Sequence, residues 1–210
     1  MLYLKMKLRS CLSLTIIIVL VIAFAALSYK RNSIWIEETT LWDDAIKKSP
    51  KKARPYLSHG LAFHKIGQYE KAIKNYDIAI SIKPDYAIAY TSRGIAFYKL
   101  GQYEKAFKNY NMAIAIKPTY AIAYFNRGIA FHDIGEYDKA IEDYNKAIAI
   151  NPNYAEAYTN RGTDYALKGQ YKMAIEDFKE ACKMGDRNAC LNLGIMTKSI
   201  LFQGIKKPSQ

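Results

Sequence analysis

The sequence contains few of the residues that most often perform catalysis or bind metals. Its 210 residues include 3 histidines and 3 cysteines. His59 and His64 stand five residues apart, so they diverge around a helix, and no carboxylate or cysteine stands at ligand spacing. No Ser-His-Asp or Cys-His arrangement and no phosphate-cradling glycine loop is present. We therefore expect no metal, no cofactor and no enzymatic activity.

The sequence also has no cluster of charge of one sign in its centre. The formal net charge is +12, but the basic excess sits largely at the two ends, and residues 53–188 carry mixed signs. Mixed signs are typical of a solvated helical surface. A nucleic-acid-binding surface has a basic stripe with base-reading or stacking residues. We therefore expect neither a nucleic-acid partner nor a small-molecule substrate.

One long stretch lacks charge altogether. No charged residue occurs from Ser10 to Tyr29, and a helix of that length matches the ~30 Å hydrocarbon core of a bilayer. After a basic tail (1–9), residues 10–29 are therefore predicted to form a transmembrane helix that anchors the chain in the lipid bilayer. A signal peptide cleaved at Ala23-Phe24-Ala25 is the alternative, but the apolar run is longer than a usual signal core. Basic residues flank both sides; we expect residues 30–210 on the non-cytoplasmic side, periplasmic or extracellular.

The remainder is dominated by self-similarity at a period of 34 residues, over 53–86, 87–120, 121–154 and 155–188. Each unit has an aromatic at its fourth position, a glycine at its eighth and another aromatic at its eleventh. After a second glycine (Gly67, Gly101, Gly135 or Gly169), the sequence Ala-x3-aromatic-x2-Ala follows, and a proline closes the first three units. These residues are Tyr56, Gly60, Phe63, Ala72, Tyr76, Ala79 and Pro84 in the first unit.

The spacing predicts two helices in each unit. Steps of three and four keep the aromatic and small residues on one helical face, the second glycine permits a left-handed cap, and the proline ends the second helix. A glycine inside a helix costs roughly 1 kcal/mol relative to alanine. Its recurrence at the eighth position in four units indicates that the partner helix passes too close for a side chain. At least three stacked units are needed to bury such faces.

These residues resemble the tetratricopeptide repeat over residues 53–188. The resemblance implies an all-α fold: a solenoid of four helical hairpins behind one N-terminal transmembrane helix, with half-repeat caps. A junction and capping half-repeat (30–52), with a short helix around Trp35–Lys48, precedes the array, since Trp42, Ala45 and Pro50 lie one period before Tyr76, Ala79 and Pro84. A capping helix near Ala189–Phe202 and a tail (189–210) follow it.

One departure from the family recurs at the seventh position, where an apolar residue is usual. Here it is His59, Arg93, Arg127 and Arg161, and it tracks the twenty-third position, which is Asn75, Asn109, Asp143 and Asp177. A partly buried arginine needs such a partner. We therefore expect Arg127–Asp143 and Arg161–Asp177 ion pairs within hairpins, and hydrogen bonds to the amides in the other two.

Two narrower resemblances lie at the flanks. Arg31-Asn32, Trp35, Glu37-Glu38 and Leu41-Trp42 directly follow the apolar stretch, and this junction is similar to that of the transmembrane-and-tetratricopeptide O-mannosyltransferase family. The segment Ala181-Cys182-Lys183-Met184-Gly185-Asp186 with Ala189-Cys190 is similar to Sel1-like cysteine-rich repeats, which pair cysteines across a hairpin. Eight residues of helix span about 12 Å, too far for a disulfide, so a Cys182–Cys190 bond requires a turn, for which Gly185-Asp186 is suited. Two reduced, buried cysteines are the alternative.

The tetratricopeptide resemblance also implies a concave peptide-binding groove lined by the second, fifth, sixth, ninth, twelfth and thirteenth positions. Leu57 and Leu61 stand where carboxylate-clamping subfamilies need lysine and asparagine, so that activity is not expected. Exposed apolar residues in a groove favour a protein partner; coverage by one of the chain's own terminal helices is the alternative. The groove residues are Leu57, Ser58, Leu61, His64, Ile88, Thr91, Ser92, Ile95, Tyr98, Lys99, Ile122, Phe125, Asn126, Ile129, His132, Asp133, Glu156, Thr159, Asn160 and Thr163.

The sequence thus predicts a membrane-anchored adaptor that binds other proteins or peptides. One alternative is a C-terminal piece or accessory subunit of a membrane glycosyltransferase. Another is a secreted solenoid released by signal peptidase.

Overall fold

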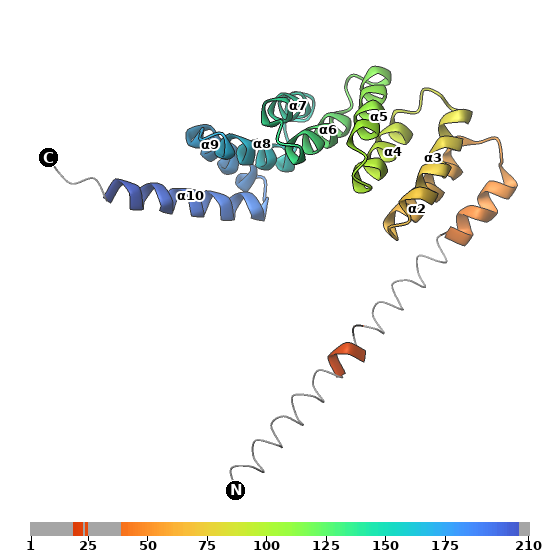
Figure 1. The fold of residues 1–210 in the computed structure, drawn as a ribbon, viewed down its shortest axis with the longest axis horizontal. Coiled ribbons are helices and arrows are strands. Elements are labelled where there is room, and N and C mark those ends of the chain that lie inside the picture. The colour runs from red at the N-terminus through yellow and green to blue at the C-terminus, as the bar shows by residue number, and fades with distance from the viewer. Residues whose placement is uncertain (1–18, 23, 25–38, 206–210) are drawn as a thin grey trace, which may run out of the picture.

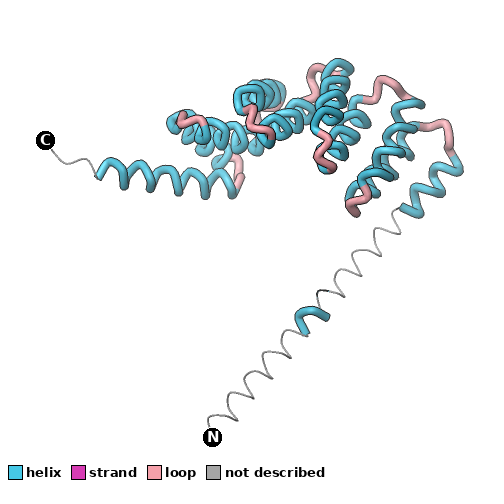
Figure 2. The backbone as a smooth tube through the Cα atoms, in the orientation of Figure 1, coloured by secondary structure: helices cyan, strands magenta, loops and turns pink. Residues whose placement is uncertain are grey.

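The computed structural model describes residues 19–22, 24 and 39–205, with side chains as far as residue 198. Helices follow one another along the array (Figures 1 and 2), and the first described in full is the capping helix of residues 39–48. No strand occurs among the described residues. The others are α2 (Ala53–Lys65), α3 (Tyr69–Ile82), α4 (Ala87–Lys99), α5 (Tyr103–Ile116), α6 (Ala121–Asp133), α7 (Tyr137–Ile150), α8 (Ala155–Leu167), α9 (Tyr171–Lys183) and α10 (Arg187–Ile205).

The four predicted hairpins are confirmed. Within each, the first helix packs on the second, and the second packs on the first helix of the following hairpin, so the units form a continuous solenoid. The turn inside each hairpin depends on its glycine. Gly67, for example, has φ 77°, a left-handed conformation that a residue with a Cβ adopts only with strain.

The eighth-position glycines let the two helices of a hairpin approach closely, as predicted. A Cβ on Gly60 would lie 2.5 Å from Tyr76 Cε1, and one on Gly128 would lie 2.6 Å from Tyr144 Cε1. Both rings are almost completely buried, at 0% and 1% exposure. Each second helix thus places its aromatic ring flat against the glycine of its own hairpin, and the buried alanines of that helix extend the close contact.

The hydrogen-bonded arginines are confirmed, and they do more than predicted. Arg127 donates from Nε and Nη2 to the carboxylate of Asp143 at 2.7 and 2.6 Å, and Arg161 binds Asp177 in the same bidentate manner. Arg93 Nε donates to Asn109 Oδ1 at 2.7 Å. Planar arginine–carboxylate pairs of this kind are among the stronger polar contacts in proteins.

Each arginine also reaches back to the preceding hairpin. The Nη1 atoms of Arg93, Arg127 and Arg161 donate to the side-chain oxygens of Asp77, Asn111 and Asn145, which occupy the twenty-fifth position of the previous unit. His59 stands at the same point in the first unit, with Nε2 3.6 Å from Asp43 Oδ1 of the capping helix. The expected hydrogen bond from His59 to Asn75 is not formed: neither ring nitrogen has a hydrogen-bond partner among the described residues, and the Asn75 amide donates to the carbonyl of Lys71 instead. The seventh position therefore connects successive hairpins, which accounts for its polar character.

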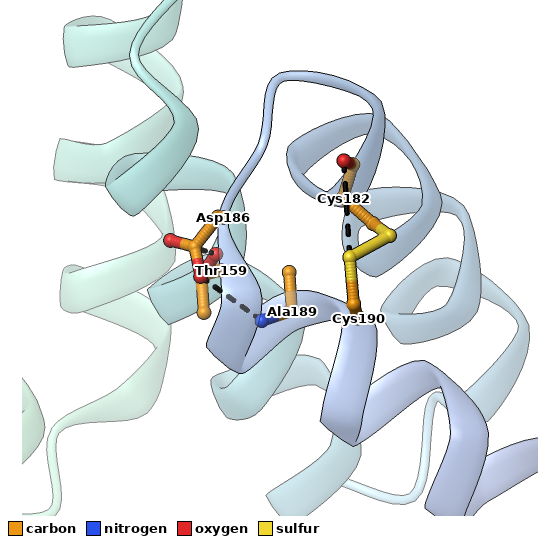
Figure 3. The surroundings of a disulfide bond; sticks show 5 residues. All are labelled: Thr159, Cys182, Asp186, Ala189 and Cys190. Carbon is orange, nitrogen blue, oxygen red and sulfur yellow. Dashed lines mark hydrogen bonds between the residues drawn. A yellow bond between two sulfur atoms is a disulfide. The ribbon is translucent and has the colours of Figure 1, made fainter.

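The chain turns back sharply between α9 and α10. Gly185 has φ 93°, and the Cα atoms of Cys182 and Cys190 lie 4.8 Å apart, joined by a disulfide (Figure 3). Asp186 accepts from the amide of Ala189 and from the hydroxyl of Thr159, so it caps α10 and ties the turn to α8. The terminal helix begins at Arg187 and runs to Ile205, rather than the predicted Ala189–Phe202, because this cap lies earlier.

The predicted transmembrane helix (10–29) lies, apart from residues 19–22 and 24, outside the described residues. The tail of residues 1–9 and most of the junction before residue 39 do so as well. Within the part of the chain that the structure describes, no helix combines the length and apolar character that crossing a membrane requires.

Candidate functional site

The twenty residues predicted to line the groove differ in exposure. Leu57, Thr91, Ser92 and Thr159 are buried, so the prediction that they line an open surface is wrong. Exposed residues are Leu61, Ile88, Lys99, Ile122, Asp133 and Glu156, and half-buried ones are Ser58, His64, Ile95, Tyr98, Phe125, Asn126, Ile129, His132, Asn160 and Thr163.

Three of the four buried residues stand at the fifth position of their units. Leu57, Thr91 and Thr159 all stand there, and each is less than a tenth exposed. The Thr159 hydroxyl contacts Asp186 of the following turn, and Phe125 at the same position stacks on Tyr154, with ring centroids 4.6 Å apart. The fifth position therefore faces the next hairpin along the array, and it is free only where no hairpin follows.

Two aromatic groove residues have structural as well as surface roles. Phe125 packs on Tyr144 and Tyr154, and the Tyr98 hydroxyl donates to Asp133 Oδ2 at 2.6 Å. The Tyr98–Asp133 hydrogen bond links α4 to α6. Replacing these rings would consequently disturb packing in addition to any bound partner.

The groove contains two recesses in equivalent places. One, of about 190 Å³, is lined by Ile129, His132, Tyr144, Asn160 and Thr163. The other, of about 270 Å³, lies one unit further along and is lined by Thr163, Ala166, Leu167, Phe178, Asn192, Ile195 and Met196. Both lie between successive first helices, above the aromatic ring of a second helix. Two successive units therefore form equivalent shallow recesses.

The first recess is backed by a buried acid that the sequence reasoning missed. Asp164 is 0% exposed and its Oδ1 pairs with Nδ1 of His132, whereas its Oδ2 has no hydrogen-bond partner among the described residues. Burial raises the pKa of Asp164, and the hydrogen bond to His132 offsets part of this rise. The signal was available in the sequence, because Asp164 occupies the tenth position, where the other units have Ala62, Ala96 and Ala130.

Two other titratable groups of the groove have shifted pKa values. Burial, and in addition the hydrogen bond to Asp133, raises the pKa of the Tyr98 hydroxyl. Burial, and to a smaller extent nearby Lys99, lowers the pKa of His64, which is therefore neutral at pH 7. Among the described residues no group of three or more His, Cys, Asp or Glu side chains is arranged to hold a metal. The groove offers hydrogen-bonding and apolar contacts for binding.

Comparison with known families agrees with this architecture. A model described as TPR repeat matches residues 60–101 and 96–135, and one described as Tetratricopeptide repeat matches residues 121–154 and 155–184. Together they cover more than half of the chain. The chain belongs to the tetratricopeptide repeat family, whose fold is typical of non-enzymatic scaffolds that bind other proteins.

Among solved structures, the chain is similar to MamA. One crystal structure of MamA is 28% identical with a TM-score of 0.65, covering 76% of this chain and 94% of that one. A second crystal structure of MamA protein is also 28% identical, with a TM-score of 0.63, covering 76% and 87%. MamA 41-end from Desulfovibrio magneticus RS-1 is 23% identical, with a TM-score of 0.63 and coverage of 73% and 87%, and shows the fold alone. The search of curated proteins found no match. The resemblances to O-mannosyltransferases and Sel1-like repeats stay predictions.

Proposed function

We propose that this chain is a membrane-tethered scaffold whose concave groove binds an extended or helical segment of another protein. The observation that carries the proposal is the pair of equivalent recesses between successive first helices. Two recesses separated by one repeat suit a polypeptide, whose side chains also recur at regular intervals. Ile88 and Ile122, both 44% exposed, add apolar surface at the start of α4 and of α6.

The chemistry of the first recess favours a basic side chain in the partner. Asp164 Oδ2 lacks a hydrogen-bond donor among the described residues, and Asp133, next to His132 at the end of α6, supplies an exposed carboxylate. An unpaired buried acceptor is stabilised by a donor, most strongly by a charged one. A lysine or arginine of a bound segment, flanked by apolar residues, fits these groups.

A combinatorial peptide library displayed on phage tests this. Panning the full chain should enrich sequences that combine Lys or Arg with apolar residues, and Asp164→Asn, which keeps the shape, should weaken their binding about tenfold or more. Asp138→Asn is the matched control, since Asp138 is an exposed carboxylate of α7 that pairs with Lys168 and should not affect binding. Enriched peptides without a basic residue, or equal binding to Asp164→Asn, would contradict the proposal.

The membrane tether is supported by the uncharged residues 10–29, whose length suits a bilayer crossing. The protein should remain with membranes through a carbonate wash, and its mature mass should include residues 1–29. A mature N-terminus at Ala26 would instead indicate a secreted protein. Protease added to sealed cells or vesicles should reach the repeats only from the non-cytoplasmic side.

A further inference from the structure

The two ends of the described array are unlike each other in a complementary way. The array begins with the capping helix (39–48), which has the register of a second helix, because Trp42 lies one period before Tyr76. It ends with α10, which has the register of a first helix. Ala189 is buried like Ala89, Ala123 and Ala157 at the third position, and Gly194 follows it by five residues, as the eighth-position glycines follow the others. The described array therefore has half a hairpin at each end (Figure 1).

No described helix occupies the place of a second helix on α10. In the four complete hairpins, a Cβ on the eighth-position glycine would lie 2.5–2.9 Å from the nearest ring carbon of the second helix, whereas at Gly194 no such atom lies within 4 Å. Leu191, at the fifth position, is 65% exposed, although Leu57, Thr91 and Thr159 there are 6%, 2% and 7% exposed. Among the described residues, Gly194 thus lacks the aromatic ring of a second helix, and Leu191 lacks the following hairpin that covers the fifth position in the earlier units.

The capping helix has the ring that would fill this slot. Trp42 is half-buried, while its equivalents Tyr76, Tyr110 and Tyr144 are at most 1% exposed. Inside the array a second helix packs between the first helix of its own hairpin and that of the next. The capping helix contacts α2, the first helix of the next hairpin, as the approach of Asp43 to His59 indicates. It lacks a first helix of its own among the described residues.

At the two ends of the array, apolar residues replace the polar pairs of the seventh and twenty-third positions. In the complete hairpins the seventh and twenty-third positions are both polar, as in Arg127 with Asp143. In α10 the seventh position is Leu193, and in the capping helix the twenty-third is Leu41, which is 63% exposed. Lys179 occupies the twenty-fifth position in α9, where a carboxylate or amide would otherwise accept from an arginine. An apolar residue on one end thus matches an apolar residue on the other.

We propose that copies of this chain associate head to tail, the capping helix of one copy packing on α10 of another to complete a fifth hairpin. Trp42 lies over Gly194 of the other copy, and Leu41 lies beside Leu193. The following α2 covers Leu191, as each hairpin covers the fifth position of the one before it. The contact joins two different surfaces, so it can repeat and extend the solenoid through many copies.

Pairwise cysteine crosslinking tests this geometry. The full chain, in detergent micelles and with Cys11→Ser, carries either Leu41→Cys or Leu193→Cys, and a short bismaleimide is added. Neither variant alone should crosslink, their mixture should give a covalent dimer, and a chain carrying both should give a ladder of multimers. Lys47→Cys mixed with Leu193→Cys is the control, because Lys47 has the register of exposed Ser81 on α3. Crosslinking of Leu41→Cys with itself, or no crosslinking in the mixture, would overturn the proposal.

A second variant separates assembly from folding. Gly194→Ala places a Cβ that meets nothing in its own chain but would meet the incoming Trp42 ring. Sedimentation velocity should show association weakened at least tenfold, with the melting temperature of the dilute monomer not lowered. Association equal to that of the natural chain would show that Gly194 is not in the interface and would refute the model.

Discussion

Two glycines at the same position of the repeat should respond oppositely to the same substitution. In Gly128→Ala the new Cβ would lie 2.6 Å from Tyr144 Cε1, with the ring 1% exposed and unable to move away. In Gly194→Ala the new Cβ meets no atom of the described residues within 4 Å, apart from the neighbouring backbone of its own helix. Both changes replace a glycine in a helix by alanine, so they share the same gain in helix propensity, about 1 kcal/mol.

The comparison isolates the steric term because the shared gain cancels. A carbon–carbon contact at 2.6 Å is well inside the optimum of about 3.5–4.0 Å, and overpacking of this kind costs about 1–3 kcal/mol. Gly194→Ala should therefore be more stable than Gly128→Ala by about 1–3 kcal/mol. For a chain of this size that corresponds to about 2–4 °C in melting temperature for each kcal/mol.

Urea denaturation followed by circular dichroism, at a dilution where the chain is monomeric, measures both free energies of unfolding. Tyr144→Leu in the Gly128→Ala background supplies the control, because it removes the ring atoms that the new methyl group meets. The cost of Gly128→Ala should then fall, which a double-mutant cycle reports as coupling. Equal stability of the two glycine variants, or a cost of Gly128→Ala that is independent of Tyr144, would refute the close-packing argument.

Three further outcomes are expected. Arg127→Leu and Asp143→Asn should couple by about 1–2 kcal/mol in a double-mutant cycle, since the first leaves the buried Asp143 carboxylate without its guanidinium and the second removes the charge that the half-buried Arg127 pairs with; strict additivity would exclude the contact. Asp164→Ala should raise the free energy of unfolding by about 1–2 kcal/mol at pH 7, because it removes a buried carboxylate with an unpartnered oxygen. Because the pKa of Asp164 is raised in the folded state, the folded chain binds the proton more tightly, so this gain should shrink as the pH falls towards 4; a gain that grows instead would contradict the assignment. Cys182→Ser with Cys190→Ser should lower the stability of the α9–α10 unit by about 2.5 kcal/mol, the entropy of closing a loop of this length, and hydrogen exchange of α10 should rise; unchanged exchange would show that the disulfide contributes nothing.

Much of the fold followed from spacing alone. A period of 34 residues, a glycine opposite an aromatic, and an arginine opposite an aspartate are local patterns, and helix geometry converts them directly into faces and contacts. The pairing of Arg127 with Asp143 could be read in this way because both lie in one hairpin, where the short turn fixes how the helices meet. The groove was less predictable, since its exposure depends on the next unit as well as on the unit itself.

The hairpins, their glycine–aromatic contacts and the polar seventh position can therefore be predicted from the sequence, because each depends on residues within one repeat. The contacts between repeats become visible only in the folded array. It buries the fifth position under the following hairpin, and it brings His132 to Asp164 across 32 residues. It also shows that the short turn at Gly185 keeps α10 in the register of a first helix, leaving Gly194 uncovered. These features arise from stacking, whose rise and rotation per unit are properties of the packed side chains rather than of any local spacing.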